Sequence, residues 1–329
     1  MSESRVTQPG ALRRRVLHPA TLISFGAAVL LLVALIRGAD ISIGEMVEAA
    51  GEANVLLVVA ALVAYYVNFP LRGIRWRILI RNAQAADGGE PAPLPSAYAF
   101  AESVFLGWFV NAISWLRMGD AYRGYLISRQ GRGHSYPTLL GSLIGERVID
   151  AISFVVILVL SGAFLWVEAS GTALAITGVA LLFGGGGIVL IAVFVVFGKR
   201  VTGRLPPAVG EWTERLRIGA ITSLSGRMPA IVTLSFAAWL AEIARLLLVT
   251  WALGMDVPLP VIAFVALAHN LITSIPATPG GLGFAEAGMV ALLLPWMPLE
   301  DAAVLTALDR SVSWLSVVVL GAMAMGWRE

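Results

Sequence analysis

Residues Ile275–Glu286 read IPATPGGLGFAE and interrupt an apolar sequence that would otherwise continue as a helix. The two prolines remove backbone donors, and Gly280, Gly281 and Gly283 permit dihedral angles that other residues resist. The backbone is therefore expected to break here. In a hydrocarbon layer an unpaired N–H or C=O group is costly, so irregular backbone persists only where protein buries it or water reaches it. We expect this loop to line a site.

The composition around this loop is that of a membrane protein. The chain has 329 residues, of which 58% are hydrophobic and 13% charged, a balance far from that of soluble globular domains. With no cysteine and three scattered histidines, the sequence predicts neither a disulfide framework nor a metal site, and no cofactor is expected. Signatures of nucleophile elbows, P-loops and zinc proteases are missing, and no basic patch suits nucleic acid. The predicted class is an all-α, polytopic integral membrane protein.

Basic residues around the apolar runs predict the topology. Arg13–Arg15 precede the first run and the loop after it is acidic, so the positive-inside rule places the N-terminus in the cytoplasm. We expect a cytoplasmic tail over residues 1–19 and one transmembrane domain over residues 20–327. Arg328 places the C-terminus in the cytoplasm too, and the expected location is a bacterial-type plasma membrane. Six spanning helices are expected, near 20–36, 54–71, 137–167, 172–197, 230–253 and 301–327.

Two further segments are expected to be re-entrant helical hairpins. Residues 97–116 are apolar with polar interruptions and have arginines on both sides, which is difficult to reconcile with a full crossing. A single short spanning helix is the alternative for this segment. Residues 261–296 run into the broken loop and back, so this hairpin enters from the opposite face. Such an arrangement is typical of inverted-topology transporters and indicates an inverted repeat, although the halves share no convincing sequence identity.

Other arginines are assigned to the cytoplasmic flank of a span, and other tryptophans to the membrane interface. The arginines are those that follow the second span, Arg72, Arg75, Arg77 and Arg81, and the tryptophans include Trp108, Trp239 and Trp314. Residues 211–227 alternate apolar side chains with arginines, which indicates an amphipathic helix on the inner interface. His269 and Asn270, just before the broken loop, are expected to form hydrogen bonds between helices.

Charged residues inside the predicted spans are the candidates for chemistry. Each costs about 2.5 kcal/mol or more on insertion scales, and such residues usually face a partner or an aqueous cavity. Glu146 and Asp150 are four residues apart and share a helix face, with Arg147 close to that face. Glu242 and Arg245 are three residues apart in the same way. Asp309 and Arg310 are adjacent, so they point about 100° apart and each is expected to pair with another helix.

These residues predict a polar cavity that holds an anionic head group. Arginine suits phosphate because its planar guanidinium forms two parallel hydrogen bonds, and a glycine-rich loop can add backbone N–H groups. The expected head-group ligands are Arg117, Asp120, Arg123, Arg147, Arg245, Arg310, Gly280, Gly281 and Gly283. Charge balance or proton coupling is expected of Glu102, Glu146, Asp150, Glu242, Glu286 and Asp309. The alternative is that the same charges are buried ion pairs that join helices and bind no ligand.

Three motifs follow one another along the chain. They are Asn111 with Arg117-Met-Gly-Asp-Ala-Tyr-Arg123, then Glu146-Arg-Val-Ile-Asp150, then Pro276-Ala-Thr-Pro-Gly-Gly-Leu-Gly-Phe-Ala-Glu286. In this order they resemble the lysylphosphatidylglycerol synthase transmembrane region, or flippase-like domain, family. The resemblance covers about residues 21–325. One departure is Ser114–Leu116, where the family usually has a proline before its Arg-x-Gly-Asp element.

The resemblance implies a lipid flippase-type membrane protein. The family includes the membrane half of the multiple peptide resistance factor, which is taken to move aminoacylated phosphatidylglycerol between leaflets. The soluble aminoacyl transferase domain that would follow is absent from this sequence, so the chain is not expected to be an enzyme that makes lysylphosphatidylglycerol. The expected function is translocation of an anionic or aminoacylated phospholipid or of a polyprenyl-phosphate-linked lipid. Expected partners are membrane lipids, a lipid-modifying transferase and a second copy of the chain.

Two other classes of function stay open at this point. The chain could be a non-transporting partner or scaffold of a lipid-modifying or glycosyl transferase, which predicts a closed, dry interior. It could also be an integral-membrane enzyme that acts on a lipid, which needs a convergent acid/base pair such as Glu146 with Asp150.

Overall fold

The computed structural model describes residues 50–86, 93–114, 118–130, 135–166, 206–274 and 278–326, together with the single positions 44, 48, 178, 186, 189 and 193. These residues form helices joined by turns, and no strand occurs among them. The all-α prediction is therefore confirmed for the described part of the chain. The predicted tail, the first span, nearly all of the fourth span and Arg117 lie outside it.

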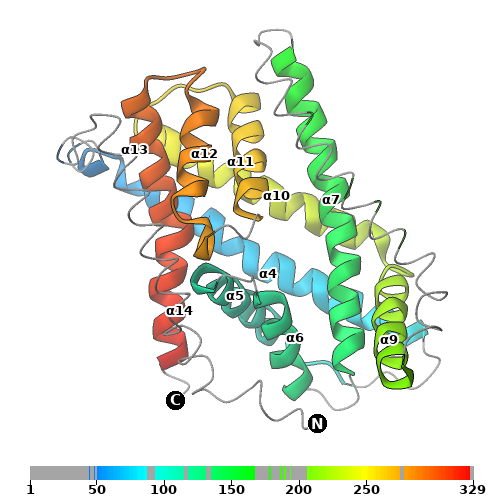
Figure 1. Cartoon of the computed structure of the whole chain (residues 1–329). Helices are drawn as coiled ribbons and strands as arrows, with labels where there is room; N and C mark the ends of the chain where they lie inside the picture. The colour runs from blue at the N-terminus through cyan, green and yellow to red at the C-terminus, as the bar shows by residue number, and fades with distance from the viewer. Residues whose placement is uncertain are drawn as a thin grey trace.

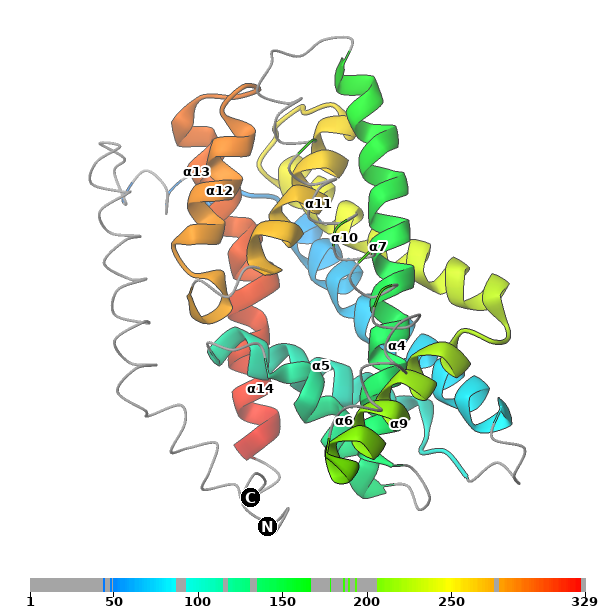
Figure 2. The same cartoon turned by 45° about the vertical axis from the view of Figure 1, so that its right-hand side comes forward.

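Long apolar helices form the scaffold of the molecule (Figure 1). By length and composition, three helical stretches are suited to cross a membrane: Val55–Ala85 within α4 (Val55–Ala86), α10 (Met228–Ala252), and Leu299–Gly326. Figures 1 and 2 show α4 and α10 side by side, and this is the most extensive contact between two described helices. These stretches agree with the second, fifth and sixth predicted spans.

Two of the long helices carry special features. The stretch Leu299–Gly326 consists of α13 (Leu299–Arg310), the π-helical turn η3 (Ser311–Leu315) and α14 (Ser316–Gly326). α7 (Tyr136–Trp166) agrees with the third predicted span and has 31 residues, a length of about 46 Å at 1.5 Å per residue. It carries three charged side chains near its middle, so α7 is long enough to cross a membrane but unusually polar at one level.

The second predicted hairpin is present as two helices around a broken loop. α11 (Leu259–Ser274) leads into the 3-10 turn η2 (Pro279–Gly281), and α12 (Phe284–Leu293) leads away from it. Gly280, Gly281 and Gly283 have φ of 61°, 74° and 79°, a backbone region that side chains with a Cβ avoid. The glycines therefore break the chain for the reason that the sequence suggests.

The first predicted hairpin differs from expectation. α5 (Ala97–Ile113) is one continuous helix, so a pair of half-helices within 97–116 is wrong. Its polar residues do not interrupt it, because Ser103 Oγ donates to the Phe100 carbonyl within the helix. The Asn111 side chain instead accepts from the Gly119 N–H at 2.8 Å, at the start of α6 (Gly119–Gln130). The paired helices are therefore α5 and α6.

Glycines let α5 and α6 approach closely. A Cβ at Gly119 would overlap the Gly107 carbonyl oxygen, so no other residue fits there without movement of the backbone. A similar contact joins α7 to α9 (Pro207–Ser223), where a Cβ at Gly141 would overlap the Leu216 carbonyl oxygen. α9 corresponds to the amphipathic helix predicted at 211–227, and it lies along α7 (Figure 2).

The two helix pairs approach each other from opposite ends of the molecule. In Figures 1 and 2, α11 and α12 extend from one end and α5 and α6 lie toward the other, with the broken loop next to α5. η2 contacts α5, and the Trp314 Nε1–H donates to the Ala112 carbonyl at 3.4 Å. This meeting point places the broken loop on the same cavity as charged residues of α4, α7 and α10.

Candidate functional site

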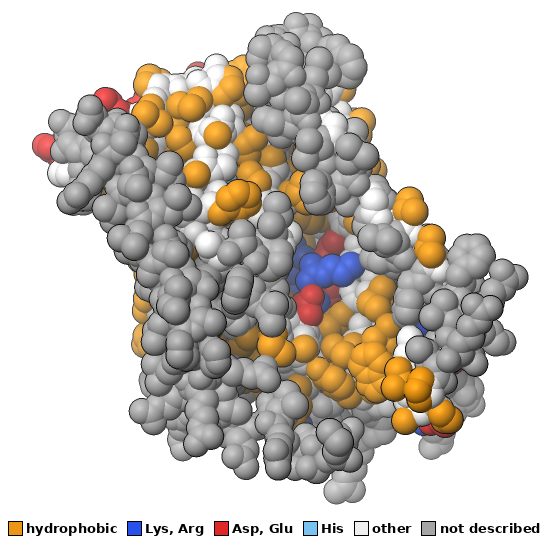
Figure 3. Space-filling view, viewed as in Figure 1, with side chains coloured by type: hydrophobic (Ala, Val, Ile, Leu, Met, Phe, Trp, Pro, Cys, Tyr) orange, Lys and Arg blue, Asp and Glu red, His pale blue; other side chains and the backbone are white. Residues whose placement is uncertain are grey.

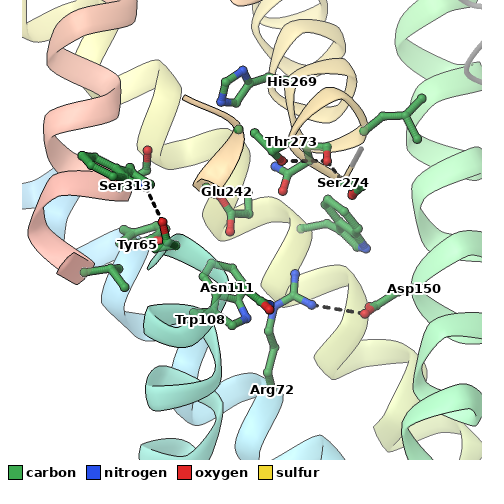
Figure 4. Close-up of a pocket in the computed structure, with 18 of the residues that line it drawn as sticks. Tyr65, Arg72, Trp108, Asn111, Asp150, Glu242, His269, Thr273, Ser274 and Ser313 are labelled. Atoms are coloured by element: carbon green, nitrogen blue, oxygen red, sulfur yellow. Dashed lines mark hydrogen bonds and ion pairs between the residues drawn. The ribbon is translucent and has the colours of Figure 1, made fainter. Parts of the chain in front are cut away.

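A cavity of about 300 Å³ lies where the broken loop and α5 meet α4, α7 and α10. Its lining combines arginines and carboxylates with aromatic rings from several helices (Figure 4). On the face drawn in Figure 3, basic and acidic side chains are visible in a hollow bordered by hydrophobic ones. The loop is therefore part of a charged pocket, as the sequence predicts.

Arg75 of α4 joins this helix to α7 through the two carboxylates that were expected to share a face. Its Nη2 lies 2.9 Å from Glu146 Oε1, and its Nη1 lies 2.5 Å from Asp150 Oδ1. Nη1 also donates to Ser235 Oγ of α10 at 2.6 Å, and the Arg75 side chain is fully buried. Glu146 and Asp150 thus flank one guanidinium, and the interaction joins three helices.

Arg72, one turn before Arg75, is stacked between two tryptophans. Its guanidinium carbon lies 5.4 Å from the ring centroid of Trp108 and 5.5 Å from that of Trp239. Nη1 donates to Asp150 Oδ2 at 3.2 Å, and Nε donates to Asn68 Oδ1 at 3.2 Å (Figure 4). Such stacking holds a cation in place while its charge still faces the cavity.

Three tryptophans line the cavity, so their assignment to an interface belt is wrong. They are Trp108, Trp239 and Trp314. Trp108 and Trp239 enclose Arg72, and the guanidinium of Arg310 lies 5.7 Å from the ring centroid of Trp314. The indoles face inward because they stack on buried arginines, which a belt prediction based on position along the helix does not consider.

Arg123 and Arg147 complete the side of the cavity formed by α6 and α7. Arg123 is buried and lies 3.3 Å from Glu146 and 3.2 Å from Asp120. Arg147 pairs with Asp120 at 2.6 Å rather than with its helix neighbour Asp150, and both side chains of this pair are partly exposed, at 45% and 39%. The Arg147–Asp120 pair is therefore the accessible ion pair of the site.

We refer to this group of charges as the basic half of the cavity. It comprises Arg72, Arg75, Arg123 and Arg147 with Asp120, Glu146 and Asp150. Four guanidinium groups face three carboxylates, so the described members carry one excess positive charge. An excess of positive charge at a partly open pocket favours an anion.

A second group of charged residues in the cavity is centred on Arg245 of α10. Its Nε lies 3.3 Å from Glu242 Oε2, one turn away on the same helix. Its Nη1 pairs with Asp309 of α13, and the guanidinium lies 5.7 Å from the ring centroid of Tyr65. The i,i+3 pairing of Glu242 with Arg245 and the interhelical partner of Asp309 are both confirmed.

Arg310 connects α13 to the broken loop. Its Nε lies 2.6 Å from Glu286 Oε1, and its Nη2 donates to the Gly280 carbonyl at 3.0 Å. Arg310 directly precedes the π-helical turn Ser311–Leu315, a geometry that is rare and often found at functional sites. The predicted pairing of Arg310 with another helix is confirmed, because Glu286 lies in the first turn of α12, and Arg310 also binds the loop through Gly280.

The loop does not present the N–H groups of Gly281 and Gly283 to an anion, and in this respect the prediction is wrong. The Gly283 N–H donates to Glu286 Oε2 at 2.6 Å, and the Gly281 N–H donates to the Thr278 carbonyl at 3.0 Å. The Gly283 donor is used because Glu286 turns back to cap its own helix, and the Gly281 donor closes the turn that begins at Thr278.

We refer to this second group as the acidic half of the cavity. It comprises Arg245 and Arg310 with Glu242, Glu286 and Asp309. Three carboxylates face two guanidinium groups, so the described members carry one excess negative charge. Each of the five side chains belongs to a buried residue.

The structure gathers most of the predicted site residues in one place. Those that line the cavity are Arg123, Arg147, Arg245, Arg310, Gly280, Gly281, Glu146, Asp150 and Glu242. Asp120, Glu286 and Asp309 contact these arginines from behind, and Gly283 is held by Glu286. Glu102 lies on α5 and is not among the lining residues, while Arg117 is outside the described residues.

Comparison with known proteins agrees with this arrangement of motifs. The family model described as the lysylphosphatidylglycerol synthase TM region matches residues 20–321. This chain belongs to the lysylphosphatidylglycerol synthase TM region family. The resemblance that the three motifs suggest is therefore confirmed over nearly the whole sequence.

Named relatives of this family member occur in archaea. It is 26% identical to the glycosyltransferase AglD of Haloferax volcanii over 356 residues, which cover 95% of this chain and 55% of AglD. It is also 26% identical to a UPF0104 membrane protein of Methanothermobacter thermautotrophicus over 337 residues, 93% of this chain and 94% of the relative. A UPF0104 membrane protein of Methanocaldococcus jannaschii is 26% identical over 220 residues, 65% of this chain and 92% of the relative. The chain thus spans about half the length of AglD.

Sequence reasoning missed two arginines of this family member, Arg72 and Arg75. The second span was predicted to end at residue 71, with the arginines in the cytoplasm, whereas α4 continues to Ala86 and buries both. Arg72 and Arg75 follow Asn68 by four and seven residues, so all three lie on one face of a helix. This spacing in the sequence could have indicated that α4 continues past residue 71. Arg77, on another face, donates instead to the Pro95 carbonyl at 3.0 Å.

Proposed function

We propose that this protein moves a phosphate-bearing lipid between the leaflets of a membrane. The observation that carries the proposal is the basic half of the cavity, with its one excess positive charge and its accessible Arg147–Asp120 pair. Arginine binds phosphate through two parallel hydrogen bonds, and an ion pair at the mouth of a pocket can exchange its carboxylate for a phosphate. The substrate class is an anionic or aminoacylated phospholipid or a polyprenyl-phosphate-linked lipid.

The size of the cavity fits a head group rather than a whole lipid. A volume of about 300 Å³ is at the lower end of the range of small-molecule sites. Acyl chains would therefore stay in the bilayer while the head group passes through the protein. Trp108, Trp239 and Trp314 supply rings on which a sugar or an acyl ester can pack.

The proposed topology has six crossings, two re-entrant helix pairs and an inverted repeat. Its support is the approach of α5–α6 and α11–α12 from opposite ends and the contact of the broken loop with α5. In this topology both termini are cytoplasmic and the protein lies in the plasma membrane. Transport would occur by rocking of the two halves around the cavity, as in other transporters with inverted repeats.

A second candidate function is that of a non-transporting membrane partner of a transferase. The assembly would contain the transferase or a second copy of this chain. Its support is one relative, the glycosyltransferase AglD, of which this chain spans 55%. The enzyme alternative has less support, because Glu146 and Asp150 both contact Arg75 and are buried. They hold helices together and are not a free acid/base pair.

The test is lipid exchange in proteoliposomes. Wild type would be compared with Arg147→Ala and with Arg217→Ala, a matched control on α9 outside the cavity, using fluorescent phosphatidylglycerol, its lysyl form and a polyprenyl phosphate. We expect faster exchange of at least one lipid than in protein-free vesicles, slowed roughly tenfold or more in Arg147→Ala and kept in Arg217→Ala. Folded protein that accelerates none of these lipids would contradict transport and favour the transferase partner.

A further inference from the structure

The acidic half of the cavity has more negative than positive charge, and its residues are buried. Glu242, Glu286 and Asp309 are at most 9% exposed, and so are Arg245 and Arg310. Two pairs account for the arginines: Arg245 with Asp309, and Arg310 with Glu286. Glu242 is the carboxylate left over, at a longer 3.3 Å from an Arg245 that already serves Asp309. A buried carboxylate without its own counter-charge is unfavourable, so something must neutralise it.

The geometry around Glu242 has room for a bound group. Glu242 Oε1 is buried and has no hydrogen-bond partner in the described part of the chain. His269, which is 4% exposed and comes from a different helix, α11, interacts with the backbone of Ala285 and supplies no hydrogen bond to Glu242. Glu242 and His269 both line the cavity (Figure 4). Glu146 Oε2 and Asp309 Oδ2 also lack a partner, but the other oxygen of each of these carboxylates is held closely by an arginine. Glu242 combines an unpartnered oxygen with the longer 3.3 Å contact, so its charge is the least compensated of the three.

The neighbours of Glu242 on every packed helix limit what this occupant can be. The charged or titratable groups around it are Tyr65 of α4, Arg245 of α10, His269 of α11, Glu286 of α12, and Asp309 and Arg310 of α13. Arg245 already occupies the space between Glu242 and Asp309. Among the described residues no group of three His, Asp or Glu could hold a metal ion. A proton needs no such ligand shell and adds no volume.

We propose that Glu242 is a proton-binding site, which holds one proton in this conformation and exchanges it with the cavity. With the proton in place the acidic half is neutral, because each remaining carboxylate has its own arginine. The cavity as a whole then keeps the single positive charge of the basic half, which matches one phosphate charge. This last consequence rests on the proposed lipid transport, whereas the proton site itself does not.

The experiment is infrared spectroscopy of the purified protein in detergent, in sodium-free buffer at neutral pH. We expect a carbonyl stretching band of a protonated carboxyl group that shifts in D₂O and disappears at alkaline pH. Glu242→Gln should lose this band, since the amide mimics the neutral acid without a proton to release. Glu146→Gln, a buried glutamate between Arg75 and Arg123, is the matched control and should keep it.

The outcome decides the proposal without any transport measurement. A wild-type spectrum with no protonated carboxyl band at neutral pH would overturn it, and so would a band that persists in folded Glu242→Gln. If Glu242→Gln does not fold, Glu242→Asp takes its place: a shorter carboxyl group should shift the band, and an unchanged band in folded Glu242→Asp would overturn the proposal. Exchange assays that fail for every lipid would count against transport and leave this proton site standing, so the two failures are distinguishable.

Discussion

The basic and acidic halves of the cavity are built from the same residue types but have opposite balances. The basic half draws its arginines from α4, α6 and α7, has one excess positive charge, and includes a partly exposed pair. The acidic half surrounds Arg245 and Arg310, has one excess negative charge, and is buried throughout. Taken together, the described members of the two halves carry no net charge. The difference separates two tasks: an open excess of positive charge suits an anionic ligand, and a closed excess of negative charge suits a proton.

The largest expected effect is loss of the arginine that organises the basic half. Arg75→Met would leave Glu146 and Asp150 with fewer partners inside the protein, and breaking a buried ion pair costs about 3–5 kcal/mol. We expect a large drop in the thermal unfolding temperature in detergent. Arg77→Met, on the same helix but bonded to a backbone carbonyl, should unfold close to wild type. Equal stability of the two variants would show that the ion pairs of Arg75 do not stabilise the packing of α4 against α7.

A smaller effect on stability is expected where the broken loop meets α5. A Cβ at Gly280 would overlap Trp314 Nε1 and lie 2.6 Å from the Ala112 carbonyl oxygen, whereas a Cβ at Gly254 meets nothing within 4 Å. Both glycines have positive φ, 61° and 69°, so alanine carries a similar backbone cost of about 1–2 kcal/mol at each. We expect Gly280→Ala to be less stable than Gly254→Ala by a further 1–3 kcal/mol or so, from overpacking. Equal unfolding temperatures would mean that the loop and α5 do not depend on this contact.

Arg147→Ala tests whether the open side of the basic half serves binding rather than stability. Exposed ion pairs contribute roughly 0–1 kcal/mol, so unfolding should change little. A hydrogen bond to a charged ligand is worth about 1.5–3 kcal/mol, so lipid exchange should slow by roughly ten- to hundredfold. Exchange and unfolding would be measured on the same preparations. A variant that loses stability but keeps normal exchange would reverse the assignment.

The smallest effect on the fold is expected from Glu242→Gln, which nevertheless changes the pH response. If Glu242 holds a proton as proposed, its loss at high pH cancels the net positive charge of the cavity, so exchange of a phosphate lipid by wild type should fall. The variant keeps the neutral form at every pH, so its exchange should stay near the low-pH wild-type rate. Parallel pH profiles for wild type and variant would contradict a role of this proton in transport.

Sequence patterns predicted the helices of this protein better than the contacts between those helices. α7, α9, α10 and the helix from Leu299 to Gly326 agree with predicted segments, because their apolar runs and flanking charges are local signals. A continuous α5 was only the alternative prediction, since polar residues in an apolar run look like a break until their hydrogen bonds are known. The length of α4 was underestimated because Arg72 and Arg75 resemble a cytoplasmic flank.

By itself the sequence determined which charges share a helix face and where the backbone must break. Spacing of four residues set Glu146 and Asp150 together, and glycines at positive φ opened the loop at Gly280, for reasons confined to one turn of chain. Only the tertiary structure decided that Arg147 pairs with Asp120, that Arg75 lies between the two carboxylates, and that Glu242 is left without its own arginine. These choices depend on which helices pack together, and pairing between helices is a property of three-dimensional distance that residue spacing does not encode.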